Sequence, residues 1–270
     1  MKHVRPIAVL FLSGILALTS CKKEVKTAAD DIPQSVKDLI YAAGFGTSNI
    51  QRVDEGYLVE GDIILTPEYL SNHPKQMLLR AGTEEQYHTT NLVSTNGSRN
   101  ITVSLSNRLP SSYLPSVDIM VQRYNALNLQ ISFTRVSSGG EIQFVPGHGS
   151  YLASSGFPDS QGNPYGSVKV NSQYLGSGNG SSTFNNYIAT ILAHEVGHCI
   201  GFRHSDYFNR SISCGGSAVN EGASSVGAIW IPNTPQQPNV DSKSWMLSCI
   251  GTNQDRPFTN YDQSALNYLY

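Results

Sequence analysis

The chain has 270 residues, of which 14% are charged, and its formal net charge is −2 at pH 7. A chain of this length can bury a sizeable core, either as one large domain or as two modest ones. The sequence has no basic region that would suggest a nucleic-acid partner and no acidic block typical of a solvated tail.

The first residues resemble the export signal of a bacterial lipoprotein. A short positive region precedes an apolar run from Ile7 to Leu18, which is too short to span a bilayer comfortably. Small residues then lead to Cys21, as in a lipobox, whose cysteine is lipidated and becomes the mature N-terminus. This implies a signal peptide over 1–20, a tether over 21–32 and a lipid anchor in the bacterial cell envelope. Lys22 favours the outer membrane, with the protein facing the periplasm or the surface. An ordinary secretory signal is the alternative.

A small N-terminal region is expected over residues 33–92. Its apolar spacing after Pro33 predicts a short amphipathic helix. Residues 50–53 and 57–65 predict two strands joined by a turn. The signals between residues 70 and 100 are weak and suggest a linker.

Stronger patterns begin at Ile101 and alternate between strands and helices. We expect strands at 101–105, 129–136, 141–145 and 166–171, and helices at 115–127, 183–200 and 262–270. Thr183 is the expected N-cap of the second of these helices, and residues 146–165 are expected to be a loop. This alternation, followed by a loop-rich second half, predicts an α+β fold for residues 93–270.

The most informative stretch lies at the end of the second predicted helix. His194 and His198 are four residues apart and therefore point to the same side of a helix. Gly201 can adopt the left-handed conformation that ends a helix, and the chain can then return His204 as a third metal ligand. Three neutral imidazoles leave a fourth position for water, which is the open arrangement of catalytic zinc. Glu195 lies near that position and can take a proton from the water.

Two other interpretations of these residues stay open. The helix histidines could be satisfied by hydrogen bonds alone, without a metal. Alternatively, Glu221 could replace His204 as the third ligand, although it lies 23 residues after His198.

The cysteines beyond the signal region are Cys199, Cys214 and Cys249. Export permits a disulfide, and three cysteines allow three single pairings, among which the sequence does not choose. On a helical wheel Cys199 falls on the apolar side, so we expect a buried thiol or a disulfide partner rather than a metal ligand.

The stretch HEVGHCIGFRH, residues 194–204, resembles the HExxHxxGxxH signature of metzincin metallopeptidases, and most of all the bacterial dual-action HEIGH metallopeptidases. The resemblance covers about residues 100–270. It implies a zincin-like domain with a twisted mixed β-sheet, an active-site helix, a loop-rich C-terminal subdomain and a cleft for extended peptides. Residues 244–248 resemble the methionine turn that lies beneath the metal, with Met246 as its methionine. Plain core packing is the alternative for Met246.

The same resemblance implies one catalytic zinc ion. Peptide bonds would be hydrolysed by attack of a zinc-bound water, with Glu195 as the general base. Residues 227–232 would form a wall of the pocket after the scissile bond. Residues 166–171 would offer the strand edge that pairs with the peptide.

Residues 59–63, Val-Glu-Gly-Asp-Ile, resemble a propeptide element of astacin-type metzincins. In that element an aspartate occupies the open position of the metal. The resemblance implies that Asp62 is a latency ligand and that residues 33–92 are a pro-region. In the alternative interpretation, Gly61 and Asp62 are simply part of a strand.

Together these features predict a lipid-anchored zinc endopeptidase that acts on a protein or peptide substrate. One alternative is a non-catalytic peptide- or glycan-binding lipoprotein on a protease-like fold. Another is a zinc hydrolase of non-peptide amides. A calcium site, the oligomeric state and the cleavage preference do not follow from the sequence.

Overall fold

The computed structural model describes residues 32–43, 45–72, 86–149, 151–221, 227–235 and 240–270. The predicted signal peptide and Cys21 lie outside these residues. None of the described helices combines the length and the apolar character that crossing a membrane requires.

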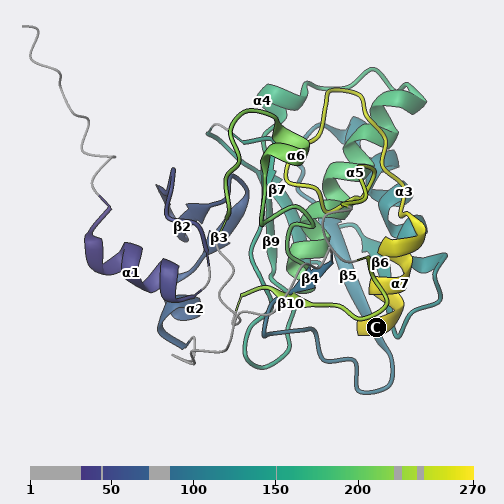
Figure 1. The fold of residues 1–270 in the computed structure, drawn as a ribbon. Coiled ribbons are helices and arrows are strands. Elements are labelled where there is room, and N and C mark those ends of the chain that lie inside the picture. Colours follow the sequence, from purple (N-terminus) through teal and green to yellow (C-terminus); the bar gives the residue numbers. More distant parts are fainter. Residues whose placement is uncertain (1–31, 44, 73–85, 150, 222–226, 236–239) are drawn as a thin grey trace, which may run out of the picture.

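A mixed sheet of five strands forms the centre of the larger part of the molecule (Figure 1). In spatial order its strands are β6 (Ile131–Val136), β5 (Arg99–Leu105), β7 (Ile142–Pro146), β9 (Ser167–Val170) and β8 (Ala153–Ser154). The first four are parallel to one another, and β8 runs antiparallel to β9 at one edge. In β5, Ile101 and Val103 are buried while Asn100 is exposed, as the alternating sequence predicts.

Helices α3 (Leu114–Asn125) and α5 (Ser182–Cys199) pack against each other, and α3 also packs on β6. Tyr124 of α3 donates a hydrogen bond to the carbonyl of Ala193, 2.8 Å away, which ties the two helices together inside the main core. The remaining helices of this part are η1 (Ser111–Tyr113), α4 (Ser172–Leu175), α6 (Ser211–Cys214) and α7 (Asn260–Leu269). Thr259 and Asp262 form a capping box at the start of α7.

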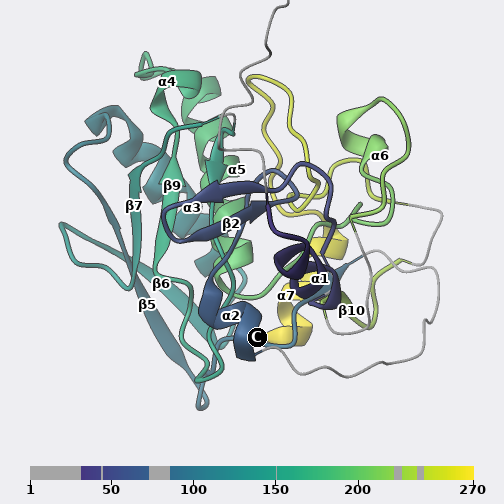
Figure 2. The same cartoon turned by 90° about the vertical axis from the view of Figure 1, so that its left-hand side faces the viewer.

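The N-terminal region lies beside this body, and its hairpin crosses in front of α5 in the view of Figure 2. It contains α1 (Gln34–Ala42), β1 (Gln51–Val53), β2 (Gly56–Val59), β3 (Ile63–Leu65) and α2 (Pro67–Asn72), with the strands in one antiparallel sheet. Its small apolar cluster includes Ile40, Phe45 and Leu65, and it takes in Phe157 from the larger body. Further on, β4 (Tyr87–His88) pairs with β10 (Ile229–Trp230).

The prediction of one continuous strand over residues 57–65 is wrong. Glu60 and Gly61 have left-handed backbone angles, with φ of 56° and 97°, and they reverse the chain between β2 and β3. We call residues 60–62 the Glu60–Asp62 turn. Because of this reversal, two acidic side chains leave the sheet and enter the larger body.

The other differences are smaller. Strand β8 lies inside the stretch 146–165, which was expected to be a loop. Helix α5 begins earlier than predicted, because Ser181 rather than Thr183 is its N-cap and accepts a hydrogen bond from the amide of Phe184, 3.2 Å away. The α+β class, the twisted mixed sheet, the active-site helix and the loop-rich C-terminal part are confirmed.

A disulfide joins Cys214 to Cys249, which is one of the three pairings that the sequence allowed. It connects α6 to the segment that follows Met246. Cys199 is a free, buried thiol within the main core, as its place on the helical wheel suggested.

Candidate metal centre and active site

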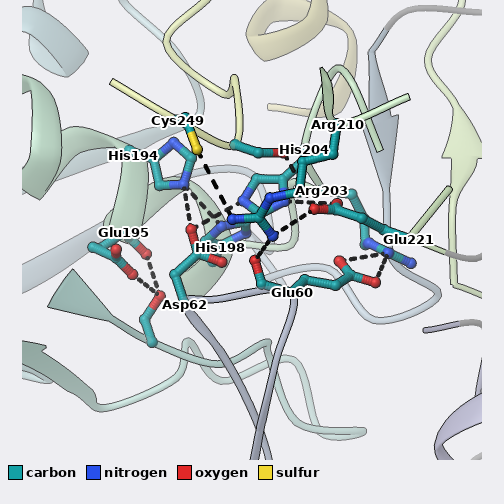
Figure 3. Close-up of polar contacts among 12 residues, drawn as sticks. Glu60, Asp62, His194, Glu195, His198, Arg203, His204, Arg210, Glu221 and Cys249 are labelled. Atoms are coloured by element: carbon teal, nitrogen blue, oxygen red, sulfur yellow. Dashed lines mark hydrogen bonds and ion pairs between the residues drawn. The ribbon is translucent and has the colours of Figure 1, made fainter. Parts of the chain in front are cut away.

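Helix α5 carries the first two histidines of the site. From Tyr187 to its end every residue of α5 is buried, so its polar side chains there need partners inside the protein. The Nε2 atoms of His194 and His198 lie 3.1 Å apart on the same side of the helix (Figure 3). This places two imidazoles at the distance expected for ligands of one ion.

Gly201 turns the chain so that His204 joins them. Its φ is 111°, and a Cβ atom here would lie 2.9 Å from the carbonyl oxygen of Asn91. Glycine is therefore needed both for the backbone angle and for the close approach of another segment. After this turn the His204 ring lies 4.9 Å from that of His198 and 5.3 Å from that of His194, measured between ring centroids.

The second nitrogen of each imidazole is held by an acceptor. The Nδ1 atom of His194 lies 2.9 Å from the carbonyl oxygen of Trp245, and that of His198 lies 2.8 Å from the carbonyl oxygen of Phe202. Nδ1 of His204 lies 2.9 Å from a carboxylate oxygen of Glu221. Because these oxygens only accept, each neutral ring carries its proton on Nδ1 and presents an unprotonated Nε2 to the centre.

This donor set fits a zinc ion. Zinc–nitrogen bonds of about 2.0–2.1 Å in a tetrahedron imply ligand atoms about 3.3–3.4 Å apart. The observed separations along the cluster are 3.1 Å from His194 to His198, 3.1 Å from His204 to Asp62 and 3.5 Å from His194 to Asp62. Two unprotonated Nε2 atoms facing each other at 3.1 Å repel unless a cation lies between them. The four side chains are therefore suited to zinc.

Calcium is less well matched. Among the described residues, two groups of side chains bring three or more ligand atoms together, and both contain His204. Calcium prefers oxygen ligands and rarely takes imidazole. Neither group therefore suggests a calcium site.

Asp62, from the Glu60–Asp62 turn, brings a fourth potential ligand atom to the three histidines. Figure 3 shows it between His194 and Glu60, with its carboxylate directed at the histidines. Burial raises the pKa of Asp62, but the positive charge of His204 when it is protonated, together with hydrogen bonds from His194 and His204, outweighs burial and leaves the pKa well below its usual value. Asp62 is therefore an anion that faces the three histidines.

Glu195 lies beside the centre and is held by Ser155. The Ser155 hydroxyl lies 2.7 Å from Oε2 of Glu195 and donates to this carboxylate. Burial raises the pKa of Glu195 well above its usual value, and the charge of Asp62 raises it further. The two carboxyl groups thus differ in pKa: that of Asp62 is lowered, which favours the ionised form, and that of Glu195 is raised, which favours the protonated form.

Met246 lies directly beneath the active-site helix and is buried. A Cβ atom on Gly197 would lie 2.6 Å from the Met246 sulfur, so the glycine permits this close packing. The neighbouring Trp245 provides the carbonyl that orients His194. The segment around Met246 therefore packs against the helix that carries His194 and His198, and its role as a methionine turn stays a prediction.

A pocket lies beside Glu195. Its lining includes Ile191, Leu247, Ile250 and Arg256, from α5 and from the chain after Met246, and also Asp62. The segment 227–232 contains β10 and does not line this pocket, so its expected place in the wall of the pocket after the scissile bond stays a prediction.

The strand edge at the site differs from the expectation. Strand β9, within residues 166–171, is interior to the sheet, because β8 covers it. The outer edge of the sheet at the site lies at β8, and Ser155, just after β8, is paired with the N-terminal region. Its amide donates to the Asp62 carbonyl over 2.9 Å, and its carbonyl accepts from the Ile64 amide over 2.5 Å.

The partners of Arg203 could not be predicted from local sequence patterns. This buried residue donates to both carboxylate oxygens of Glu60, at 2.7 and 2.8 Å, and to the carbonyl of Gly227 at 2.6 Å. Its guanidinium carbon lies 4.2 Å from the ring centre of Phe45. Glu60 and Phe45 both come from the N-terminal region, far away in the chain.

Comparison with known proteins finds a matching family model and distantly similar solved structures. The family model of the dual-action HEIGH metallo-peptidases matches residues 57–270. Among solved structures, myroilysin is 17% identical with a TM-score of 0.42, and the match covers 67% of this chain and 96% of myroilysin. High choriolytic enzyme 1, a hatching enzyme zinc-protease from the medaka fish Oryzias latipes, is 16% identical with a TM-score of 0.35, covering 66% of this chain and 92% of that one. No curated protein sequence matches. The family match confirms the resemblance drawn from the motif.

Proposed function

The chain belongs to the dual-action HEIGH metallo-peptidase family, and from this premise we propose that it is a zinc endopeptidase whose metal ligands are His194, His198 and His204. Family membership makes it a metallopeptidase that acts on peptide or protein substrates. The observation that carries the residue assignment is the convergence of the Nε2 atoms, while every Nδ1 atom is held by an acceptor.

Glu195 is the proposed general base. A zinc ion, when bound, supplies a Lewis acid that polarises the substrate carbonyl and lowers the pKa of a water. Glu195 accepts a hydrogen bond from the Ser155 hydroxyl at 2.7 Å, and it lines the same pocket as His194 and Asp62. The raised pKa of Glu195 allows it to keep an accepted proton and to deliver it to the departing amine.

The described form of the protein is closed, and we propose that it is latent. Catalytic zinc sites keep one position for water, whereas sites with four protein ligands are closed. Here the fourth ligand atom belongs to Asp62, whose Oδ2 lies 3.1 Å from Nε2 of His204. Hydrolysis requires this carboxylate to leave, so residues 33–92 are proposed to act as a pro-region.

Three further contacts support the assignment of the Glu60–Asp62 turn as an inhibitory element. Arg203 holds the Glu60 carboxylate through two hydrogen bonds, and Arg210 donates to the Glu60 carbonyl. Ser155 pairs with the main chain at Asp62 and Ile64. The turn therefore uses the outer sheet edge that an extended substrate would need.

Export and a lipid anchor at Cys21 are a separate proposal. The disulfide between Cys214 and Cys249 supports export, because such bonds persist in oxidising compartments. Localisation to the outer membrane of a bacterium follows from the lipobox resemblance alone. Metabolic labelling with radioactive palmitate tests the proposal: the wild-type chain should incorporate the label and sediment with membranes, whereas Cys21→Ser should not be labelled. Equal labelling of both chains would contradict it.

The experiment for the catalytic proposal compares Glu195→Gln with its parent in cleavage of casein and of a peptide library. Both chains should carry Asp62→Ala, so that the fourth ligand does not mask activity. We expect about a 100-fold loss or more for Glu195→Gln, because general base catalysis contributes about 10²–10⁴-fold. Glu141→Gln, at an exposed carboxylate that pairs with Arg99, is the matched control and should keep full activity.

Undiminished cleavage by Glu195→Gln would show that Glu195 is not the general base. If the Asp62→Ala parent retains zinc but cleaves nothing, the alternative of a non-catalytic binding protein is favoured instead. Sequencing of the cleavage products from the same library defines the substrate preference.

A further inference from the structure

Glu221 lies directly behind the third histidine. Its buried carboxylate has one oxygen 2.9 Å from Nδ1 of His204 and the other 2.9 Å from Nη1 of Arg210. The Nε2 atom of His204 faces the opposite way, toward Asp62 at 3.1 Å. Glu221 contacts Nδ1 of His204, on the side of the ring that faces away from the other two histidines. The geometry therefore does not support the alternative in which Glu221 replaces His204 as a ligand.

We infer that Glu221 is a positioning residue, which sets the orientation and the tautomer of His204 and thereby the affinity of the zinc site. This inference rests on the proposed function, since it assumes that the three Nε2 atoms hold zinc. Carboxylates that accept the second N–H of a metal-bound histidine fix the ring and raise its basicity as a ligand.

His204 depends on this partner more than the other two histidines do. His194 and His198 belong to one rigid helix, and their Nδ1 atoms are held by main-chain carbonyls of Trp245 and Phe202. His204 lies beyond Gly201, outside the helix, and its Nδ1 partner is a side chain. The orientation of the third ligand therefore depends on the identity of residue 221.

Only a carboxylate satisfies both donors that face residue 221. The imidazole N–H of His204 and the guanidinium of Arg210 each need an acceptor, and a carboxylate offers one on each oxygen. A glutamine offers one acceptor oxygen and one donor NH2 group. Its NH2 group would therefore face the N–H of either His204 or Arg210, and that N–H would lose its acceptor. Substitution by glutamine should therefore disturb His204 although the shape of the side chain is kept.

Arg210 is held in turn by the disulfide-bonded segment. Its Nε lies 3.3 Å from the sulfur of Cys214, which is bonded to Cys249. Ser248, next to that cysteine, places its hydroxyl 3.4 Å from the Arg210-bound oxygen of Glu221. The disulfide thus closes the segment whose side chains surround the Glu221 carboxylate.

The test measures zinc affinity of the full chain by competition with a fluorescent zinc chelator. We expect Glu221→Gln and Glu221→Ala each to bind zinc about 10-fold more weakly or worse, the effect typical of losing such a partner. Glu141→Gln is the control and should stay within about twofold of wild type. Absorption of the cobalt(II)-loaded chains should show an altered ligand field in the Glu221 variants. Circular dichroism melting establishes that each variant is folded.

A double variant separates positioning from general loss of structure. In Arg210→Met with Glu221→Gln, the second donor is gone, so the amide oxygen is free to accept from His204. Both chains are compared in the Asp62→Ala background, because Arg210 also donates to the Glu60 carbonyl of the turn that carries Asp62. There the double variant should bind zinc more tightly than Glu221→Gln alone. The inference is overturned if Glu221→Gln keeps zinc affinity within twofold of wild type, or if the double variant binds no better. A wild-type chain that holds no zinc would instead contradict the proposed function.

Discussion

Arg203 and Glu60 form a buried ion pair with two hydrogen bonds, 2.7 and 2.8 Å long, and their side chains are 0% and 1% exposed. Arg203 immediately precedes His204, while Glu60 is two residues before Asp62. The pair therefore joins the segment that carries His204 to the turn that carries Asp62, the proposed fourth ligand.

Glu60→Ala should destabilise the full chain. It leaves the Arg203 guanidinium buried without its carboxylate, and removal of one partner from a buried pair costs about 3–5 kcal/mol. Urea unfolding measures the change in the free energy of unfolding. The matched control is Glu141→Ala, which breaks a partly exposed pair with Arg99 and should cost about 1 kcal/mol or less. Similar losses for the two variants would contradict a structural role for the buried pair.

Asp62→Ala should activate the unprocessed chain. An internal ligand on the metal keeps the open form a minor population, so we expect peptide cleavage to rise about tenfold or more. Initial rates on one fluorogenic peptide, measured before any processing of the N-terminal region, provide the comparison. Asp54→Ala, at an exposed aspartate between β1 and β2, is the control and should leave the rate unchanged. Equal rates for Asp62→Ala and wild type would show that Asp62 does not restrain the site.

Ser155→Ala should lower catalysis without releasing zinc. The substitution removes the 2.7 Å hydrogen bond to Glu195 but keeps the main-chain pairing at this position. Hydrogen bonds to charged groups contribute about 1.5–3 kcal/mol, which corresponds to a loss of about tenfold or more in kcat. Measurements in the Asp62→Ala background should show this loss in kcat, with little change in KM.

Ser154→Ala is the control for that variant. The Ser154 hydroxyl is also buried, and it has no hydrogen-bond partner among the residues that the structure describes. Its removal should leave kcat within about twofold. A kcat for Ser155→Ala that equals the control would show that Ser155 does not position Glu195.

Gly201→Ala should destabilise the fold and weaken zinc binding. The backbone angle, φ 111°, is unfavourable for alanine, and the new Cβ would lie 2.7 Å from a methyl carbon of Leu92 and 2.9 Å from the Asn91 carbonyl. We expect a loss of about 3 kcal/mol or more in thermal or urea unfolding. At Gly139 φ is also positive, at 69°, but nothing lies within 4 Å, so Gly139→Ala should cost only about 1 kcal/mol. Equal costs would exclude the close approach as the reason for glycine at residue 201.

Local sequence spacing was sufficient to predict the helix that carries His194 and His198, and the turn at Gly201. These features depend on residues within about one helical turn of each other, where periodicity and backbone preference act directly. The strands of the main sheet were predicted for the same reason, because Ile101 and Val103 alternate with outward-facing residues.

The long-range contacts could not be predicted in this way. The β-propensity of Leu58, Val59, Ile63 and Ile64 favoured one continuous strand, whereas the structure reverses the chain at Gly61. Strand β8 has only two residues, and it is recognisable only through its pairing with β9. No local pattern indicates which cysteines pair.

The partners of the site were missed for a related reason. Ser155 and Glu195 are 40 residues apart, and Arg203 and Glu60 are 143 residues apart. In the sequence, Glu221 is an alternative third metal ligand, because a glutamate downstream of two histidines is also consistent with direct ligation. Only the fold decides that its carboxylate reaches Nδ1 rather than the metal side of the cluster.

The zinc content of the purified chain tests the central claim most directly. Elemental analysis of chelator-free protein should find one zinc per wild-type chain, and His204→Ala should lose it, because one of three imidazole ligands is gone. The exposed His148 offers the control, and His148→Ala should retain one zinc. A wild-type chain without zinc, or His204→Ala that holds zinc as tightly as wild type, would contradict the proposed three-histidine centre.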